Sequence, residues 1–202
     1  TSEKLLYKLI INYNNKEDYF IYDNQIIDQK INFLHKKLKL NHGTFNEELP
    51  EQKIIIRFLT GNEKVLEIGS NIGRSSLIIS HILNNNDNNN FVTLESDEES
   101  YNKLIENKEI NDLDFYTENF ALSKRNLIQN KWNTYPSDTI IEGFKKINTI
   151  NLSDLYNKYN IDFDTLILDC EGAFYYILLD MPEILNNIKL IIMENDYNDI
   201  NH

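Results

Sequence analysis

The residues best suited to chemistry begin with KVLEIGSNIGRSS, residues 64–76, where an apolar run leads into a glycine turn and a polar continuation. Such a turn before a helix is a common nucleotide-binding arrangement, because the helix N-terminus presents unpaired N–H groups and glycine lets a ligand approach the backbone. Dinucleotide sites use G-x-G-x-x-G. Asn71 replaces the second glycine of that pattern, and no G-K-[ST] follows, so neither a pyrophosphate turn nor a P-loop is predicted.

The pattern that remains in this turn is an acid followed by spaced small residues: Glu67, Gly69, Asn71 and Gly73. It resembles motif I of the class I S-adenosylmethionine (SAM) methyltransferases. The resemblance implies that all four residues bind the cofactor, with Glu67 holding the amino end of the methionine, directly or through water. Arg74 and Ser75 open the following helix, so we expect them to meet the methionine carboxylate.

A second acid, Glu95, ends the apolar run FVTLE and lies 22 residues beyond Gly73. A carboxylate at the end of the second strand can accept both ribose hydroxyls of an adenosine. Asn119 and Phe120 follow the third expected strand and are placed to reach adenine. These residues and the turn together predict SAM binding. An oxidoreductase that uses NAD is the enzyme alternative, and the missing pyrophosphate turn argues against it.

Several blocks along the chain resemble the FkbM family of methyltransferases over about residues 60–197. The blocks are VLEIGSNIGRSSL, ENFALS, INLSDLYNKYNID, FDTLILDCEGAF and IKLIIMENDY. One departure is Ile167, which stands where the family commonly has Lys. Another is that the chain ends soon after the fifth strand, where class I methyltransferases add an antiparallel pair. The sheet is therefore short, or another element fills its edge, or part of the domain is missing.

The resemblance implies SAM-dependent O-methylation of a hydroxyl on a small molecule, often a sugar or a glycan, and a carbohydrate hydroxyl is the acceptor we expect. Methyl transfer from a sulfonium to a hydroxyl needs the two reactants positioned and the hydroxyl proton removed. A catalytically inactive SAM-binding or scaffold domain of a longer multidomain protein is the non-enzyme alternative. A nucleic-acid methyltransferase is disfavoured by the formal net charge of -12.

Four acids end two neighbouring expected strands and should converge beside the reacting methyl group: Asp169, Glu171, Glu194 and Asp196. One interpretation is that Asp169, Glu194 and Asp196 bind a divalent cation such as magnesium through hard oxygen ligands. In the other, a carboxylate from Asp169, Glu171 or Glu194 is the catalytic base and its neighbours accept substrate hydrogen bonds, with Asp169 also touching the cofactor. His42, in the loop NHGTFNEE, is a further candidate base.

Composition narrows the partners of the chain. The strong negative charge argues against nucleic acid and anionic membranes as partners, so we expect a small-molecule or carbohydrate acceptor. One cysteine, no signal-peptide pattern and no long apolar run lead us to expect a cytoplasmic protein. The chain begins with Thr1, which suits a processed chain or a domain of a longer one, and its oligomeric state is left open.

The elements that must position these residues follow from the apolar pattern. Strands are expected at 64–68, 91–95, 113–117, 164–169 and 188–194, and helices at 73–84, 97–108, 153–159 and 172–186. This alternation predicts an α/β fold, a doubly wound, mostly parallel sheet of the Rossmann-like class I methyltransferase type. The SAM-binding domain should span residues 51–202, beginning with the helix that follows Pro50, within a single compact unit.

Two segments fall outside this alternation. Residues 1–50 should form an N-terminal helical extension, with an amphipathic helix at 25–40 and a short strand or aromatic staple at DYFIYD, residues 18–23. Residues 120–150 form an insertion, with a possible extra strand in FKKINTINL. Trp132 lies in this insertion and could stack on adenine or on a substrate, although insertion aromatics more often form local core.

Overall fold

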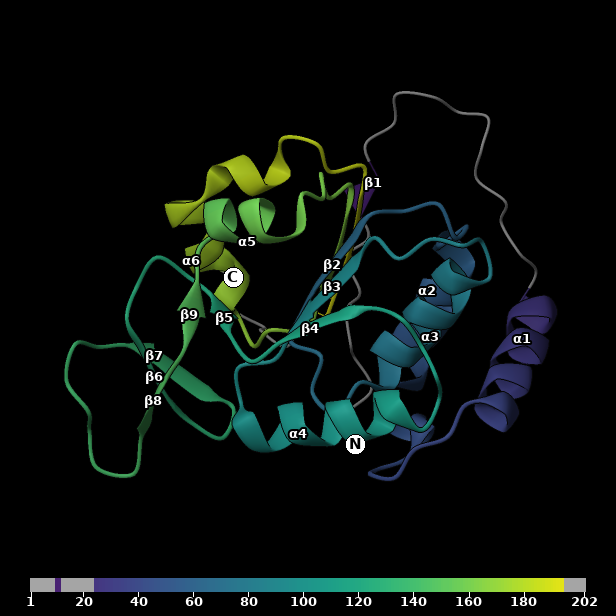
Figure 1. Ribbon diagram of the computed structural model, residues 1–202, viewed down its shortest axis with the longest axis horizontal. Helices are drawn as coiled ribbons and strands as arrows, with labels where there is room; N and C mark the ends of the chain where they lie inside the picture. Colours follow the sequence, from purple (N-terminus) through teal and green to yellow (C-terminus); the bar gives the residue numbers. More distant parts are fainter. Residues whose placement is uncertain (1–9, 12–23, 195–202) are drawn as a thin grey trace.

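The computed structural model describes residues 10–11 and 24–194, and its centre is a six-stranded sheet (Figure 1). The strand order is β1 (Ile10–Ile11), β11 (Leu190–Met193), β10 (Thr165–Leu168), β2 (Val65–Ile68), β3 (Phe91–Leu94) and β4 (Tyr116–Glu118). Every neighbouring pair is parallel except β1 with β11. Strand order reverses between β2 and β10, and ligands bind beyond the carboxyl ends of strands at such a switch point.

The central strands are apolar along their whole length because both faces of the sheet are covered. β2, β3 and β10 each have four buried residues. One face packs against α1 (Asn24–Lys37), α2 (Leu49–Phe58) and α3 (Arg74–Asn84), and α4 (Glu98–Glu109) joins this layer through Leu104. The other face packs against α5 (Leu152–Tyr159), α6 (Ala173–Asp180) and the 3-10 turn η2 (Pro182–Leu185). The predicted doubly wound α/β fold is confirmed.

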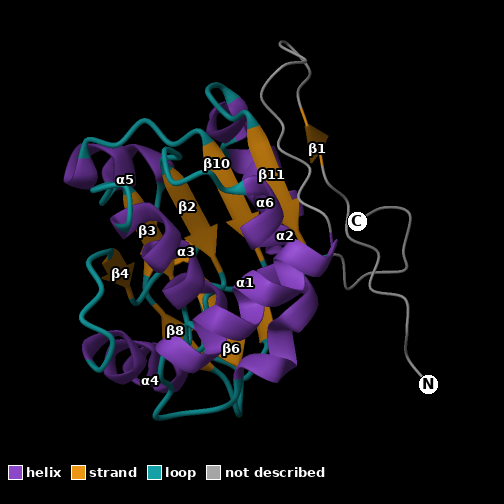
Figure 2. Cartoon of the chain, turned by 90° about the vertical axis from the view of Figure 1, so that its right-hand side faces the viewer, coloured by secondary structure: helices purple, strands orange, loops and turns teal. Residues whose placement is uncertain are grey.

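The predicted helix at 25–40 is confirmed as α1, and its apolar stripe of Ile27, Ile31 and Leu34 is buried in the same cluster as α2 and α3. Figure 2 shows α1 lying beside α2 on one side of the sheet. The 3-10 turn η1 (Phe45–Glu48) lies between α1 and α2 in the chain, and Pro50 lies in the first turn of α2. The helical part of the extension therefore contributes to the core that supports the sheet.

The edge of the sheet beyond β11 is filled by β1, which pairs with it antiparallel, Ile10 opposite Ile191. Of the three possibilities left open for the chain end, the structure therefore shows another element at the sheet edge. The segment DYFIYD, residues 18–23, lies outside the described residues.

The insertion at 120–150 is more structured than the sequence pattern predicted. It contains β5 (Ala121–Leu122), β6 (Leu127–Asn130), β7 (Asn133–Pro136), β8 (Lys145–Ile147) and β9 (Thr149–Ile150). β7, β6 and β8 form a small antiparallel sheet, whereas β5 and β9 pair in parallel. The expected extra strand is split into β8 and β9. These strands are short and polar, so their alternation gives little sequence signal.

The helix predicted at 172–186 is interrupted. α6 ends at Asp180, and η2 begins with Pro182 after Met181 leaves the helical conformation. Proline lacks an N–H and disfavours helical backbone in the residue before it, which explains the break. The break leaves α6 as a short helix beside the carboxyl end of β10.

The turn after β2 lies very close to the chain after β10. Gly69 has φ +87°, and a Cβ added to it would lie 1.7 Å from the carbonyl oxygen of Asp169. Gly69 also donates its N–H to the carbonyl of Leu94 at the end of β3, at 2.9 Å. The turn is therefore fixed against both neighbouring strands, and only glycine fits there.

A buried acid lies directly behind this turn. Glu67, in β2, is 2% exposed, and its Oε2 accepts hydrogen bonds from Ser76 Oγ at 2.5 Å and Thr93 Oγ1 at 2.6 Å. Burial raises the pKa of Glu67 to about 7, although these two hydrogen bonds lower it and Glu95 raises it further. The carboxyl group thus joins β2, β3 and α3 underneath the turn.

Gly69→Ala should destabilise the protein by about 3 kcal/mol or more, because it adds left-handed strain and a backbone clash. The matched control is Gly143→Ala, which has φ +83° but meets only Asn130 Nδ2 at 3.6 Å. That control should lose about 1–2 kcal/mol. Chemical denaturation of both variants measures the difference. Equal losses would show that the close approach to Asp169 does not constrain the turn.

Glu67→Gln should alter how stability depends on pH. The Glu67 carboxyl has its ordinary pKa of 4.5 when unfolded and about 7 when folded, so both states hold the proton below pH 4.5. Between pH 4.5 and 7 the folded state keeps the proton that the unfolded state has released, so the stability given by the proton falls as pH rises and is lost above pH 7. The free energy of unfolding of Glu67→Gln relative to wild type should therefore rise by up to about 3 kcal/mol between pH 4.5 and 8. A constant difference across that range would contradict this.

Candidate functional site

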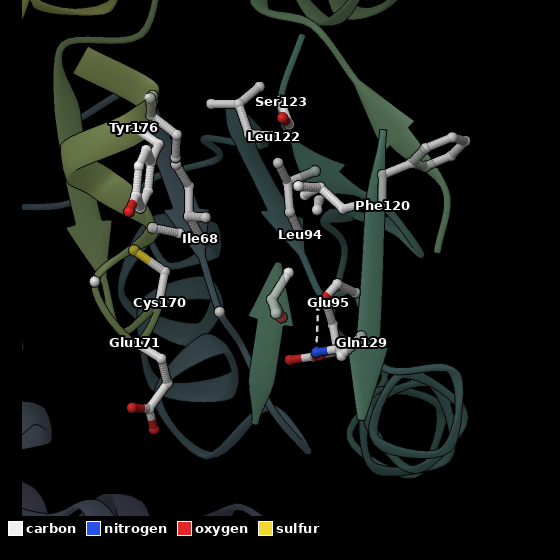
Figure 3. A pocket seen from close by; sticks show the side chains of 18 of the residues that line it. Ile68, Leu94, Glu95, Phe120, Leu122, Ser123, Gln129, Cys170, Glu171 and Tyr176 are labelled. Carbon is white, nitrogen blue, oxygen red and sulfur yellow. Dashed lines mark hydrogen bonds between the residues drawn. The ribbon is translucent and has the colours of Figure 1, made fainter. Parts of the chain in front are cut away.

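A cavity of about 300 Å³ lies at the carboxyl ends of β2, β3 and β10, where strand order reverses. Its walls come from the turn after β2, the segment after β3, the segment after β10, helix α6 and the small sheet of the insertion (Figure 3). Its size lies at the lower end of the range for cavities that bind small molecules and cofactors. The cavity therefore occupies the place where an open parallel sheet binds ligands.

The glycine turn and Glu95 meet at this cavity. Asn71, with φ +50°, donates its backbone N–H to Glu95 Oε2 at 2.6 Å. Glu95 Oε1 accepts the backbone N–H of Asp97 at 2.7 Å. Burial raises the pKa of Glu95, whereas these backbone hydrogen bonds lower it. Each carboxylate oxygen has two lone pairs, so Glu95 keeps the capacity to accept two hydroxyl groups of a ligand.

The residues after β4 contribute in two ways. Phe120 lines the cavity, and Figure 3 shows its side chain on the insertion side of the site. Asn119 does not line it: Nδ2 donates to the backbone carbonyls of Glu95 at 2.9 Å and Ser96 at 3.4 Å. Asn119 thus holds the segment that carries Glu95, whereas Phe120 is itself a lining residue.

The segment after β10 supplies acids to the opposite wall. Asp169 is half-buried and Glu171 is exposed, and both line the cavity with Cys170 between them. Burial raises the pKa of the Cys170 thiol to about 12, so this cysteine is a protonated wall residue. Glu171 (φ +50°) and Gly172 (φ +79°) turn the chain into α6. Asp169 adjoins the turn through its backbone, because a Cβ added to Gly69 would lie 1.7 Å from the Asp169 carbonyl oxygen.

Arg74 and Ser75, at the start of α3, do not line the cavity and instead contact the segment before α2. Arg74 donates through Nε to the Thr44 carbonyl at 2.9 Å and through Nη1 to Glu48 Oε1 at 2.8 Å, and it also pairs with Glu47. Ser75 Oγ donates to Glu48 Oε2 at 3.2 Å. A protein carboxylate thus lies where we expected the methionine carboxylate to bind.

Four other expected residues also lie away from the cavity lining. Glu67 is behind the turn, and Gly73 lies against Leu104, whose Cδ1 would be 2.3 Å from an added Cβ. His42 is attached to α4, where its ring Nε2 lies 2.7 Å from Glu106 Oε2. Glu194 follows β11 and donates its backbone N–H to the carbonyl of Leu168 at 2.9 Å.

The possible cation site is only partly within the described chain. Asp169 and Glu194 follow neighbouring strands, whereas Asp196 lies outside the described residues. Among residues 10–11 and 24–194, no three His, Cys, Asp or Glu side chains lie together in a way that could hold a metal ion. In the same ranges no helix has both the length and the apolar character needed to cross a membrane.

Apart from Phe120 and Trp132, which we expected to reach adenine or a substrate, the sequence did not indicate which residues the insertion and α6 supply to the cavity. Trp132, Tyr135 and Gln129 come from the small sheet, and Tyr176 comes from α6. Trp132 is 63% exposed, so it is not local core. The one available signal was the aromatic content of the insertion, which does not by itself show which way the side chains point.

Ion pairs connect the insertion to the main fold beside the cavity. Arg125, before β6, contacts Asp180 of α6 through Nε at 2.5 Å and Nη2 at 2.8 Å. Lys145 of β8 contacts Asp97, the N-cap residue of α4, at 3.0 Å. The small sheet is therefore positioned against α4 on one side and α6 on the other.

Comparisons with known proteins give fold-level likeness. No protein-family model matches the chain, and a search of curated proteins gives no match. Among solved structures, the chain is similar to an O-methyltransferase of Bacillus cereus in complex with SAH (S-adenosylhomocysteine), at 16% identity and TM-score 0.43, over 90% of this chain and 76% of that one. It is also similar to SAH-bound methyltransferase PaMTH1 of Podospora anserina, at 13% identity and TM-score 0.43, over 85% and 70% of the two chains.

Proposed function

We propose that this chain is a SAM-dependent O-methyltransferase that methylates a hydroxyl of a small molecule. The observation that carries the proposal is the pairing of Glu95 with the glycine turn at the switch point of the sheet. A carboxylate fixed by the backbone N–H of Asn71, at the end of the strand next to the turn, suits the two hydroxyls of a ribose. The turn itself, with Gly69 against the backbone of Asp169, brings the ligand close to the chain.

The lining residues at the two ends of the cavity would have different roles, one in holding the cofactor and the other in catalysis. Glu95 and Phe120 would hold the nucleoside, and Asp169 and Glu171 lie at the end near α6. When bound, SAM supplies a methyl group already activated by its sulfonium. The chain then has to place an acceptor hydroxyl in line with that group and take its proton. Asp169 suits the role of base because it is half-buried and adjacent to the turn, whereas Glu171 is exposed.

The acceptor we propose is a sugar or glycan, in keeping with the resemblance to FkbM methyltransferases. Trp132, Tyr135 and Tyr176 line the cavity and are all more than two-fifths exposed. Aromatic faces of this kind pack against the apolar face of a sugar ring, and nearby carboxylates accept its hydroxyl groups. The net charge of -12 favours such an acceptor over nucleic acid.

The alternative is a scaffold domain that binds SAM without turning it over. The observation that favours it is the Glu48 carboxylate, which occupies Arg74 and Ser75 at the start of α3. Methylation of any acceptor would exclude this alternative.

Glu95→Gln should weaken SAH binding about tenfold or more, because a charged hydrogen-bond acceptor is lost from the ribose site. Gln keeps the size of the side chain and can still accept the Asn71 N–H, so the fold should survive. Glu98→Gln is the matched control, since it makes the same charge change on an exposed residue of α4. Isothermal titration calorimetry measures both. Equal affinity in the two variants would remove Glu95 from the cofactor site, and absence of SAH binding in the folded wild type would overturn the proposed function.

Asp169→Asn should lower kcat by about a hundredfold or more while the protein still binds SAH, because the variant cannot accept the hydroxyl proton. Turnover would be measured as SAH release with the best acceptor from a panel of monosaccharides, nucleotide sugars and glycans. A chelator should leave the wild-type rate unchanged. Activity that is lost on chelation and restored by magnesium would instead support a cation held by acids after β10 and β11. A fall in SAH affinity without a change in kcat would make Asp169 a cofactor-binding residue.

A further inference from the structure

One polar side chain of the cavity wall, that of Gln129, has a buried oxygen without a hydrogen-bond partner in the described part of the chain. Gln129 of β6 is only 6% exposed. Its Nε2 donates to Ser96 Oγ at 3.0 Å. Its Oε1 is buried and has no hydrogen-bond partner within the described chain. Buried acceptors are nearly always paired, so an unpaired one beside a cavity is available to accept a hydrogen bond from a ligand.

The position of Gln129 relates this acceptor to the nucleoside site. Ser96, which orients the amide, directly follows Glu95, and both residues line the cavity with Gln129. Figure 3 shows the Gln129 side chain reaching from its strand toward the cavity, close to Glu95. On β6, Gln129 lies on the same strand face as Leu127, another lining residue, because side chains alternate along a strand.

The direction in which a nucleoside would extend follows from its ribose position. If Glu95 holds the ribose hydroxyls, the base cannot lie over the glycine turn, which the rest of the cofactor occupies, and it extends past Ser96 toward the insertion. Phe120 and Gln129 line that part of the cavity. A planar base there would have an aromatic neighbour and an amide at its edge.

We propose that the Gln129 amide recognises adenine by accepting a hydrogen bond from its 6-amino group. The inference rests on the proposed function, because it takes the ribose to lie at Glu95. An unpaired carbonyl oxygen suits a base edge that donates, and the hydrogen bond to Ser96 holds the amide in place. Gln129 is then a specificity-determining residue contributed by the insertion, at a position outside the blocks that resemble methyltransferase motifs.

The test compares two ligands on two proteins. The ligands are SAH and the SAH analogue in which hydrogen replaces the 6-amino group of the purine. This analogue cannot make the proposed bond in either orientation of the amide, so a rotation of the Gln129 side chain cannot restore it. The proteins are wild type and Gln129→Leu, which keeps the side-chain size and removes the amide. Calorimetric titration gives the four affinities, and thermal unfolding without ligand checks the fold.

Wild type should bind the analogue about tenfold more weakly than SAH, and Gln129→Leu should bind SAH about tenfold more weakly than wild type does. The variant should bind both ligands with equal affinity. If it does not fold, Gln129→Met serves in the same four measurements. Equal affinity of wild type for the two ligands would overturn the inference, and so would a variant that still discriminates between them.

Failure of this inference is distinguishable from failure of the proposed function. If wild type binds SAH and Glu95→Gln weakens that binding, the cofactor site stands whatever Gln129 does. If wild type binds neither SAH nor the analogue, both the proposed function and the role of Gln129 are overturned.

Discussion

The close approach of Gly69 to the backbone of Asp169 is the constraint on which the candidate site depends. The two residues follow β2 and β10, the parallel neighbours between which strand order reverses. Because any Cβ at Gly69 would overlap the Asp169 carbonyl, the two chain segments can lie this close only with glycine there. This closeness places Asp169 beside the turn. One steric condition therefore sets both the course of the turn that a ligand would contact and the position of a candidate base.

Buried carboxyl groups hold the turn in place from two sides. Glu67, behind the turn, accepts hydrogen bonds from Ser76 and Thr93, and Glu95, in front of it, accepts backbone N–H groups from Asn71 and Asp97. Burial raises the pKa of each acid, and the hydrogen bonds partly offset that effect. A buried acid is costly unless its oxygens are paired, so these hydrogen bonds make a tightly organised region around the turn.

The insertion forms one wall of the cavity at the carboxyl ends of the central strands. Its small sheet is held against α6 by Arg125–Asp180 and against α4 by Lys145–Asp97. Partly exposed ion pairs contribute little to the free energy of unfolding. These pairs instead hold the small sheet in the position from which its side chains reach the cavity. Among those side chains, Gln129 offers an unpaired acceptor, a property that suits recognition of a ligand rather than packing.

The sequence by itself determined the fold class and the elements that carry the site. The apolar runs of β2, β3 and β10, the helices between them and the glycine turn are local patterns, and each was predicted to within a few residues. The grouping of Gly69, Asn71, Glu95 and Asp169 around one cavity also follows from the rule that parallel strands place their carboxyl ends at one edge. No local pattern in the sequence indicated that Arg74, Ser75 and His42 would point away from the cavity.

Only the tertiary structure decided which residues face the ligand space. Arg74 and Ser75 are drawn to Glu48, and His42 to Glu106, by partners that are distant in the sequence. Trp132 and Gln129 reach the cavity because short polar strands, nearly without periodicity, pair into a sheet that long-range ion pairs position. Hydrophobic periodicity indicates which face of a helix or strand is buried. The direction of a polar side chain depends on contacts between elements, and a single sequence does not specify those contacts.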